Sequence, residues 1–309
     1  MRIGNQRTVY GEALLALGAE DPRVVVLEAD LGKSTMTHAF QQAYPDRYFE
    51  MGIAEANMTS FAVGLSLTGR VAFTNSFAVF AAGRAYDQIR QGVAIGRVNV
   101  KIVGSSAGLS DFGDGATHQS VEDIAIMRAI PHMTVLVPAD APQTAAMVRW
   151  MAAHDGPVYL RISRNDLPEI TGPGDGVLTP YVLRAGGEVA LVATGAMVFR
   201  ALKAAEALAA AGIQARVVNV PCLKPLSDEA VRSACEGVRA IVTAEEHSIV
   251  GGLASAVSMA LRGDARPQRA VAIGDVFGQS APDAETLMRH YGLTEGDIQR
   301  AAAEALNGL

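Results

Sequence analysis

Short apolar runs alternate with longer amphipathic stretches along the first half of the chain. The runs are largely apolar throughout, which is typical of parallel strands buried on both faces. They predict strands at Val24–Leu27, Arg47–Phe49, Val71–Phe73, Val100–Val103, Thr134–Val137 and Val158–Ile162. Helical spacing between them predicts helices near residues 9–18, 55–67, 82–95, 121–129 and 142–153. This order predicts a parallel sheet with helices on both faces.

The alternation is interrupted between residues 166 and 188. This stretch is rich in glycine and proline and has no helical or strand period, so we predict a linker at 168–187. The alternation then resumes, with predicted strands at 189–192, 215–220, 238–243 and 270–273, and helices at 197–211, 228–235, 250–262 and twice near the end. The predicted fold class is α/β, with two doubly wound domains: a mostly parallel one at 1–167 and a smaller one at 188–309.

Composition narrows the class of protein. Of the 309 residues, 50% are hydrophobic and 19% charged, which indicates a folded chain of about two domains. The net charge of −6 argues against a basic nucleic-acid binder and gives no reason to expect an anionic membrane surface as partner. Cys222 and Cys235 lack metal-ligand spacing. No signal-peptide core or long apolar stretch is seen, so we predict a soluble cytoplasmic protein.

Polar segments follow several predicted strands, where open parallel sheets place their ligand sites. They are Glu28–Ser34, Met51–Met58, Thr74–Phe80, Gly104–Gln119 and Ser163–Asp166. Each has a purely structural alternative. Glu55 complements a helix dipole, Phe77 and Phe80 have the spacing of core residues, His118 sits in a glycine-rich loop, and Arg164 has Asp166 as a possible ion-pair partner.

Taken together, four segments resemble the C-terminal half of transketolases, a pyrimidine-binding domain followed by a C-terminal domain. Gly52–Glu55 is similar to the family's catalytic-glutamate segment, and Asp114–Gln119 with Val121 and Glu122 to its substrate loop. Ser163–Asn165 resembles the phosphate-binding arginine segment. Glu245–His247, followed by two glycines, resembles a segment of thiamine-dependent enzymes, and the role of His247 is left open.

A complete transketolase also has a diphosphate-binding domain with a Gly-Asp-Gly…Asn metal motif. Gly113–Gly115 and Gly174–Gly176 begin like that motif, but the next asparagines lie 50 and 43 residues further on, too far away. The chain therefore resembles one subunit of a split transketolase. The resemblance implies a partner subunit that carries the diphosphate domain and binds Mg²⁺ or Ca²⁺, with no metal on this chain, in an α2β2 assembly that includes a self-dimer through both domains.

The resemblance also implies thiamine diphosphate shared with the partner. Glu55 would be catalytic, holding a proton at the pyrimidine N1′. Asp30 would contact the cofactor, and either Phe77 or Phe80 would stack on the pyrimidine.

On the substrate side, the resemblance assigns two kinds of contact. His118, catalytic as well, and Asp114 would hydrogen-bond the sugar, while Arg7, Ser34 and Arg164 would bind its phosphate. The chain departs from the family at Gly104 and the following serines, where transketolases usually have a histidine. A branched, deoxy or sulfonated sugar is therefore open alongside an ordinary sugar phosphate.

Three alternative functions are consistent with these observations. The first is ketol transfer from a ketose phosphate, or a variant sugar, to an aldose. The second is that of a 2-oxo-acid dehydrogenase β subunit or a deoxyxylulose-phosphate synthase, and the third that of a non-catalytic scaffold or regulatory subunit. The run Thr117–Glu122 favours transketolase over the second, and Glu55 and His118 argue against the third.

Overall fold

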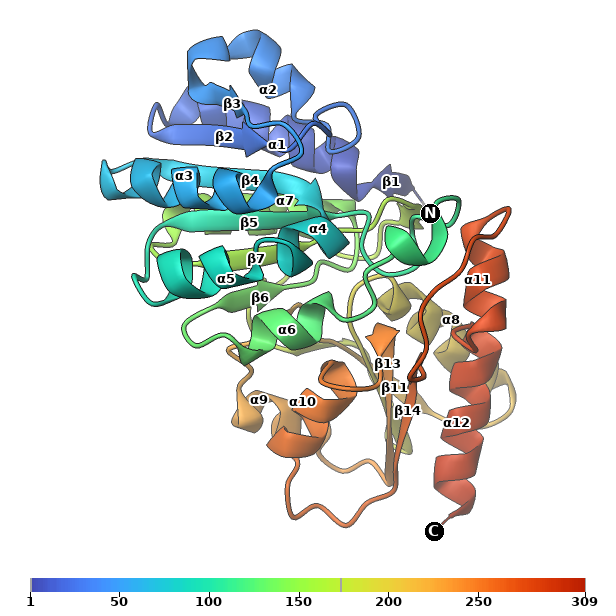
Figure 1. The fold of residues 1–309 in the computed structure, drawn as a ribbon. Coiled ribbons are helices and arrows are strands. Elements are labelled where there is room, and N and C mark those ends of the chain that lie inside the picture. The colour runs from blue at the N-terminus through green and yellow to red at the C-terminus, as the bar shows by residue number, and fades with distance from the viewer. Residues whose placement is uncertain (1, 173, 309) are drawn as a thin grey trace.

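Two α/β units, each built on a mostly parallel sheet, make up the chain (Figure 1). The computed structural model describes residues 2–172 and 174–308, so Pro173 of the predicted linker lies outside the described residues. The larger sheet has the order β12-β6-β7-β5-β4-β2-β3. Its strands are β2 Val24–Glu28, β3 Tyr48–Glu50, β4 Val71–Phe77, β5 Val100–Ser105, β6 Thr134–Leu136, β7 Val158–Arg161 and β12 Cys222–Lys224. All neighbours are parallel except β12 and β6.

Helices bury both faces of this sheet. Along β2, Val24 and Val26 belong to one apolar cluster, whereas Val25 and Leu27 belong to another. This is the consequence of side chains that alternate across a strand. The helices are α1 Gln6–Glu20, α2 His38–Ala43, α3 Glu55–Leu67, α4 Ala78–Gly83, α5 Tyr86–Gln88, α6 Asp123–Ala129 and α7 Ala141–Ala153, with short 3₁₀ turns η1 Pro45–Arg47 and η3 Gly115–Thr117.

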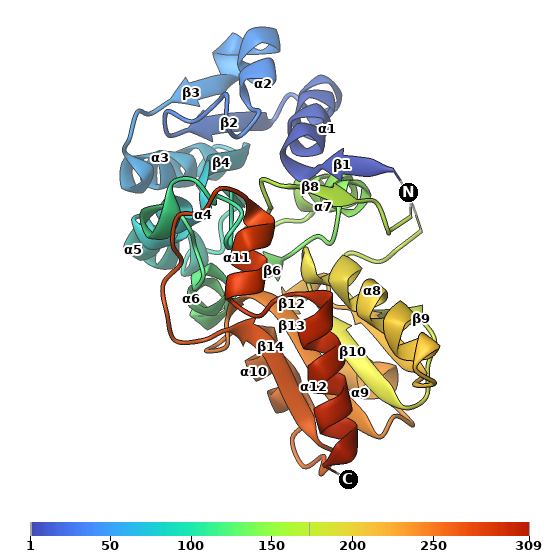
Figure 2. The same ribbon diagram turned by 90° about the vertical axis from the view of Figure 1, so that its right-hand side faces the viewer.

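The second unit has a five-stranded sheet in the order β14-β13-β10-β11-β9. Its strands are β9 Tyr181–Arg184, β10 Val189–Ala193, β11 Ala215–Asn219, β13 Ala240–Ser248 and β14 Gln268–Ile273. Its helices are α8 Met197–Ala210, α9 Asp228–Ala234, α10 Leu253–Ala260, α11 Ala284–His290 and α12 Glu295–Asn307. Helices α8 and α12 pack together on one face, while α9 and α10 cover the other (Figure 2). The α/β class with two wound sheets is thus confirmed.

Two of the sequence predictions about local structure are wrong. The stretch 166–188 contains β8 Asp166–Pro168, paired antiparallel with β1 Ile3–Asn5, as well as β9. These strands are too short to show a period, and their hydrogen bonds come from distant segments. The predicted helix 82–95 is interrupted: α4 and α5 are followed by a π-helical turn, η2 Ile89–Ala94.

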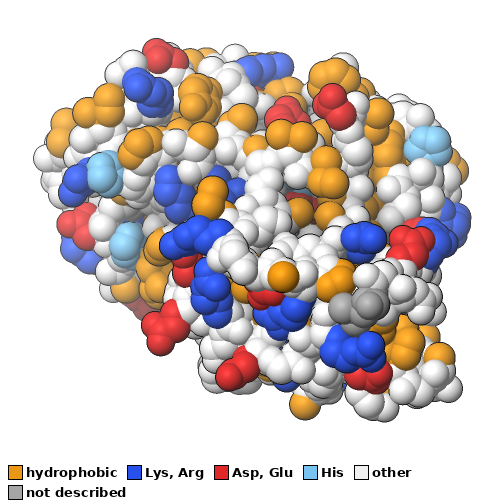
Figure 3. All heavy atoms as spheres, turned by 90° about the horizontal axis from the view of Figure 1, so that it is seen from below, with side chains coloured by type: hydrophobic (Ala, Val, Ile, Leu, Met, Phe, Trp, Pro, Cys, Tyr) orange, Lys and Arg blue, Asp and Glu red, His pale blue; other side chains and the backbone are white. Residues whose placement is uncertain are grey.

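The two units share a core. Strand β12, from the second half of the chain, forms the edge of the first sheet, and one apolar cluster contains both Met127 of α6 and Leu253 of α10. Charged side chains of both signs are intermixed on the face seen in Figure 3. No helix within the described residues is long and apolar enough to cross a membrane.

Candidate active site

A cavity of about 360 Å³ opens where the parallel strands β2 and β4 end. That volume lies in the range of small-molecule sites. It is lined by Ala29, Asp30, Leu31, Ile53, Glu55, Phe80, Arg84, Thr117 and His118. Four residues predicted from the sequence, Asp30, Glu55, Phe80 and His118, are thus brought together from segments far apart in the chain.

Glu55 is the first residue of α3, and its side chain is only 3% exposed. Arg84 Nη1 donates to both of its carboxylate oxygens, at 3.2 and 3.4 Å, and Ser76 Oγ lies 3.5 Å from Oε1. Gly52, with φ of +67°, provides the tight turn before the helix. The acid is therefore held at the cavity wall by one cation, with little contact with water.

Arg84 was not predicted as a site residue. Its guanidinium carbon lies 4.1 Å from the centroid of the Phe80 ring, so it also makes a cation–π contact. The sequence signal was the i, i+4 spacing of Phe80 and Arg84, which places both side chains on one side of a helical turn.

The two candidate aromatic residues have different environments. Phe80 lines the cavity, and its ring centroid lies 5.2 Å from that of His118 in an edge-on arrangement. Phe77 is 5% exposed, is not among the lining residues, and stacks on Phe80 at 6.2 Å. Phe80 therefore presents its ring to the cavity, supported by Phe77. His118 Nδ1 lies 2.9 Å from Thr117 Oγ1.

Two carboxylates fix the loop that carries Asp30 and Ser34. Buried Glu28 accepts hydrogen bonds from the hydroxyls of Thr35 and Thr37, at 2.7 and 2.6 Å, and burial raises its pKa to about 7. Glu50 Oε1 accepts from the backbone N–H groups of Asp30 and of Gly52, at 2.8 and 3.0 Å. Glu50 thereby ties this loop to the segment that precedes the Glu55 helix.

The predicted phosphate ligands lie near one another. Arg7 Nη1 donates to the backbone oxygen of Ser34 at 3.0 Å, and Arg164 Nη1 contacts Asp111 Oδ1 at 2.8 Å. Burial lowers the pKa of Arg7, and the positive charge of Arg164 lowers it further. Asp111, which was not predicted, thus stands beside the two arginines. Asp114 is exposed at the start of η3, and its charge helps to raise the pKa of Asp111, although burial is the larger cause.

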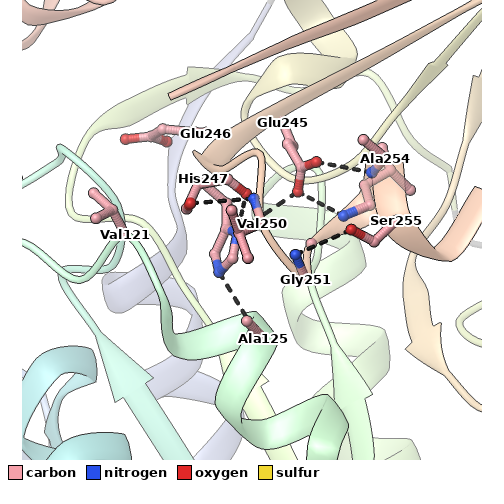
Figure 4. Close-up of polar contacts among 12 residues, drawn as sticks. Val121, Ala125, Glu245, Glu246, His247, Val250, Gly251, Ala254 and Ser255 are labelled. Carbon is pink, nitrogen blue, oxygen red and sulfur yellow. Dashed lines mark hydrogen bonds and ion pairs between the residues drawn. The ribbon is translucent and has the colours of Figure 1, made fainter. Parts of the chain in front are cut away.

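The C-terminal unit holds the loop between β5 and α6. Glu246 Oε1 accepts from the backbone N–H of Leu109 at 2.7 Å, and the Ser248 N–H donates to Val121 O at 2.7 Å. The Ala281 N–H donates to Phe112 O at 2.8 Å. Figure 4 shows Glu246 pointing away from Glu245, toward this loop. The loop that carries Asp111, Asp114 and His118 is therefore positioned by both units.

His247, whose role the sequence left open, is fully buried away from the cavity. Its Nδ1 lies 2.7 Å from Ser248 O and its Nε2 3.3 Å from the N–H of Ala125 (Figure 4). Nδ1 therefore carries the proton and Nε2 accepts, and burial lowers the pKa of the ring to about 4. Neighbouring Glu245 accepts from the N–H groups that begin α10, at 2.6 and 2.8 Å. Both side chains fix backbone at the junction of the two units.

The model of the transketolase pyrimidine-binding domain matches residues 5–169, and that of the transketolase C-terminal domain matches residues 180–298. The chain belongs to the transketolase family. It corresponds to the pyrimidine-binding and C-terminal part of a transketolase. A putative transketolase C-terminal section of Methanocaldococcus jannaschii is 41% identical over 97% of this chain and 96% of its own length.

Two further similarities are to a transketolase subunit and to a split-gene transketolase. A 6-deoxy-6-sulfo-D-fructose transketolase subunit of a Clostridium species is 42% identical over 96% of this chain and 93% of its own length. A solved structure described as a split gene transketolase, inactive beta4 tetramer, is 44% identical, with a TM-score of 0.88, and the match covers 98% of this chain and 99% of that one. Both matches thus span nearly all of this transketolase chain and of the related chain.

Proposed function

We propose that this chain is the pyrimidine-domain subunit of a split transketolase and transfers a two-carbon ketol group from a ketose phosphate, or a variant sugar, to an aldose. One observation carries the proposal: a buried glutamate, an aromatic ring and a histidine line the same cavity, at Glu55, Phe80 and His118.

The cavity suits the pyrimidine end of thiamine diphosphate. Its donor set combines a buried carboxyl group with an aromatic face, and its volume of about 360 Å³ is that of a small-molecule site. Glu55, Phe80 and Asp30 would hold the ring. When bound, the cofactor supplies a carbon centre that accommodates carbanion character.

The residues of this chain would then have separate tasks. Glu55 holds a proton at the ring nitrogen, and Phe80, backed by Phe77, excludes water from that contact. Since Arg84 pairs with Glu55, Arg84 sets the orientation of that carboxyl group. His118 hydrogen-bonds the sugar at the open side of the cavity. We assign Asp114 to the same task and Arg7, Ser34 and Arg164 to the far end of the sugar.

A partner subunit completes the proposal. We propose that it carries the diphosphate-binding domain and the Mg²⁺ or Ca²⁺ ion, in a cytoplasmic α2β2 assembly with a self-dimer of this chain. Within residues 2–172 and 174–308 no group of three or more His, Cys, Asp or Glu side chains is placed to bind a metal ion. The related structure described as an inactive beta4 tetramer supports a dependence on the partner.

Reconstitution tests the function. The chain alone is expected to bind thiamine diphosphate weakly and to turn nothing over, whereas addition of the partner should produce both tight binding, seen by calorimetry, and ketol transfer. Decarboxylation of pyruvate without ketol transfer would support the alternative activities of the wider thiamine-dependent group. A complex that binds the cofactor but has neither activity would support the non-catalytic alternative.

A further inference from the structure

Asp111 is a negative charge placed where the proposed function puts the far end of the sugar. Its side chain is 1% exposed, and Oδ1 lies 2.8 Å from Arg164 Nη1. Arg7 is close enough for the charges of Arg164 and Asp111 to act on the pKa of its guanidinium group. Asp111 is therefore paired with Arg164, and Arg7 lies near enough to be affected by the charge of both.

This corner of the molecule also contains polar atoms that lack partners. Among the described residues, Asp111 Oδ2 and Arg7 Nε are buried and make no hydrogen bond within the chain, and the same holds for Ser106 Oγ, directly after β5. Buried polar atoms without partners are costly, so such atoms point to a ligand or to bound water. Asp111 Oδ2 is an acceptor and requires a donor such as a hydroxyl group, which a phosphate dianion does not offer.

The local charge favours a ligand with little negative charge. Two guanidinium groups face Asp111, and the charge of Asp166 also acts on Arg7, so the positive charge at this corner is largely balanced. A phosphate monoester carries close to two negative charges near neutral pH, since its second pKa is about 6. Burial strengthens the repulsion between that dianion and the carboxylate.

We propose that Asp111 makes this end of the site select sugars whose far end is neutral or singly charged, rather than a phosphate dianion. The proposal rests on the proposed ketol transfer and narrows its substrate class. Ser106 lies near the position where transketolases usually have a histidine. A hydroxyl group there means that no imidazole ring is present at that position to bind a phosphate. The alternative is that Asp111 merely orients Arg164, in which case its removal should weaken the binding of every anion.

Charge removal at constant shape separates the two roles. Asp111→Asn keeps an oxygen that can accept from Arg164, and Asp46→Asn, at an exposed position, is a control with the same change in net charge. In the reconstituted complex, KM is measured for fructose 6-phosphate and for fructose with one common acceptor. The parent should bind the phosphorylated sugar no better than the neutral one. Asp111→Asn should lower KM for fructose 6-phosphate by about tenfold, equivalent to about 1.4 kcal/mol, and leave KM for fructose within about twofold.

A parent that prefers fructose 6-phosphate by tenfold or more, or an asparagine variant that weakens its binding, would overturn the proposal. A second measurement, of thermal melting, does not depend on catalytic turnover. At about pH 7.5, inorganic phosphate at about 20 mM should raise the melting temperature of Asp111→Asn more than that of the parent or the Asp46 control. If no donor is turned over, the ketol-transfer function fails, while the melting shifts still decide the role of Asp111: equal shifts reject it.

Discussion

Replacing Glu55 with glutamine tests the activating role of this carboxyl group most directly. Glu55→Gln keeps the size and the helix position of the side chain but removes the acidic proton. Groups that act as general acids and bases contribute about 10²–10⁴-fold, so ketol transfer by the reconstituted complex should fall by that factor.

The fold should survive this change. Arg84, the ion-pair partner of Glu55, is half exposed, and such pairs contribute at most about 1 kcal/mol once solvent screening is included. Loss of the negative charge at the start of α3 adds about 0.3–1 kcal/mol. The expected destabilisation is therefore about 1–2 kcal/mol, small beside the total stability of an ordinary domain.

Glu295→Gln is the matched control. Glu295 also lies in the first turn of a helix, α12, and pairs with an arginine, Arg200, at 3.1 Å, but it does not line the cavity. It should show a comparable loss of melting temperature with activity unchanged.

The assay uses NMR to measure how fast the proton at the reactive carbon of thiamine diphosphate, C2 of its thiazolium ring, exchanges for deuterium with the partner present. Thermal melting is measured alongside. If Glu55→Gln exchanges this proton at the parent rate, Glu55 is not the activating carboxyl group. A purely structural glutamate would give the same modest destabilisation as Glu295→Gln and nearly full activity.

Three further predictions have distinct outcomes. Arg7→Ala and Arg164→Ala should each raise KM for anionic sugars more than they lower kcat, because they bind a group that does not react; steady-state kinetics with unchanged KM in both variants would contradict their assignment. Burial raises the pKa of Glu28 from 4.5 to about 7, so between these values the native state binds a proton that the unfolded state does not, and stability falls as pH rises. Glu28→Gln should reduce this pH-dependent loss in the free energy of unfolding by up to about 3 kcal/mol, measured by denaturant unfolding at about pH 5 and pH 7.5. An unchanged difference between the two pH values would show that Glu28 does not titrate there. Glu246→Ala should leave the Leu109 N–H unpaired, cost about 1–3 kcal/mol and raise donor KM, while Glu246→Gln, whose amide oxygen still accepts, should restore KM; failure of this rescue would mean that the carboxylate charge, not the hydrogen bond, matters.

The sequence alone determined the layout of this transketolase subunit. Apolar runs such as Val24–Leu27 predicted strands buried on both faces, because a strand alternates its side chains and both sets here are apolar. The motif around Glu55 and the loop ending at His118 were visible as well, since each is a continuous segment whose residues can be read together. Strand order then brought their loops to one cavity.

Tertiary structure decided the strands and side-chain contacts whose partners lie far away in the sequence. Strands β8, β9 and β12 form because other segments supply their hydrogen bonds, which no local period can signal. The same reason applies to Phe80 rather than Phe77 lining the cavity and to the pairing of Arg84 with Glu55. Asp111 was one polar residue among many in a glycine-rich loop. Its burial and its contact with Arg164, 53 residues away in the chain, exist only in the folded structure.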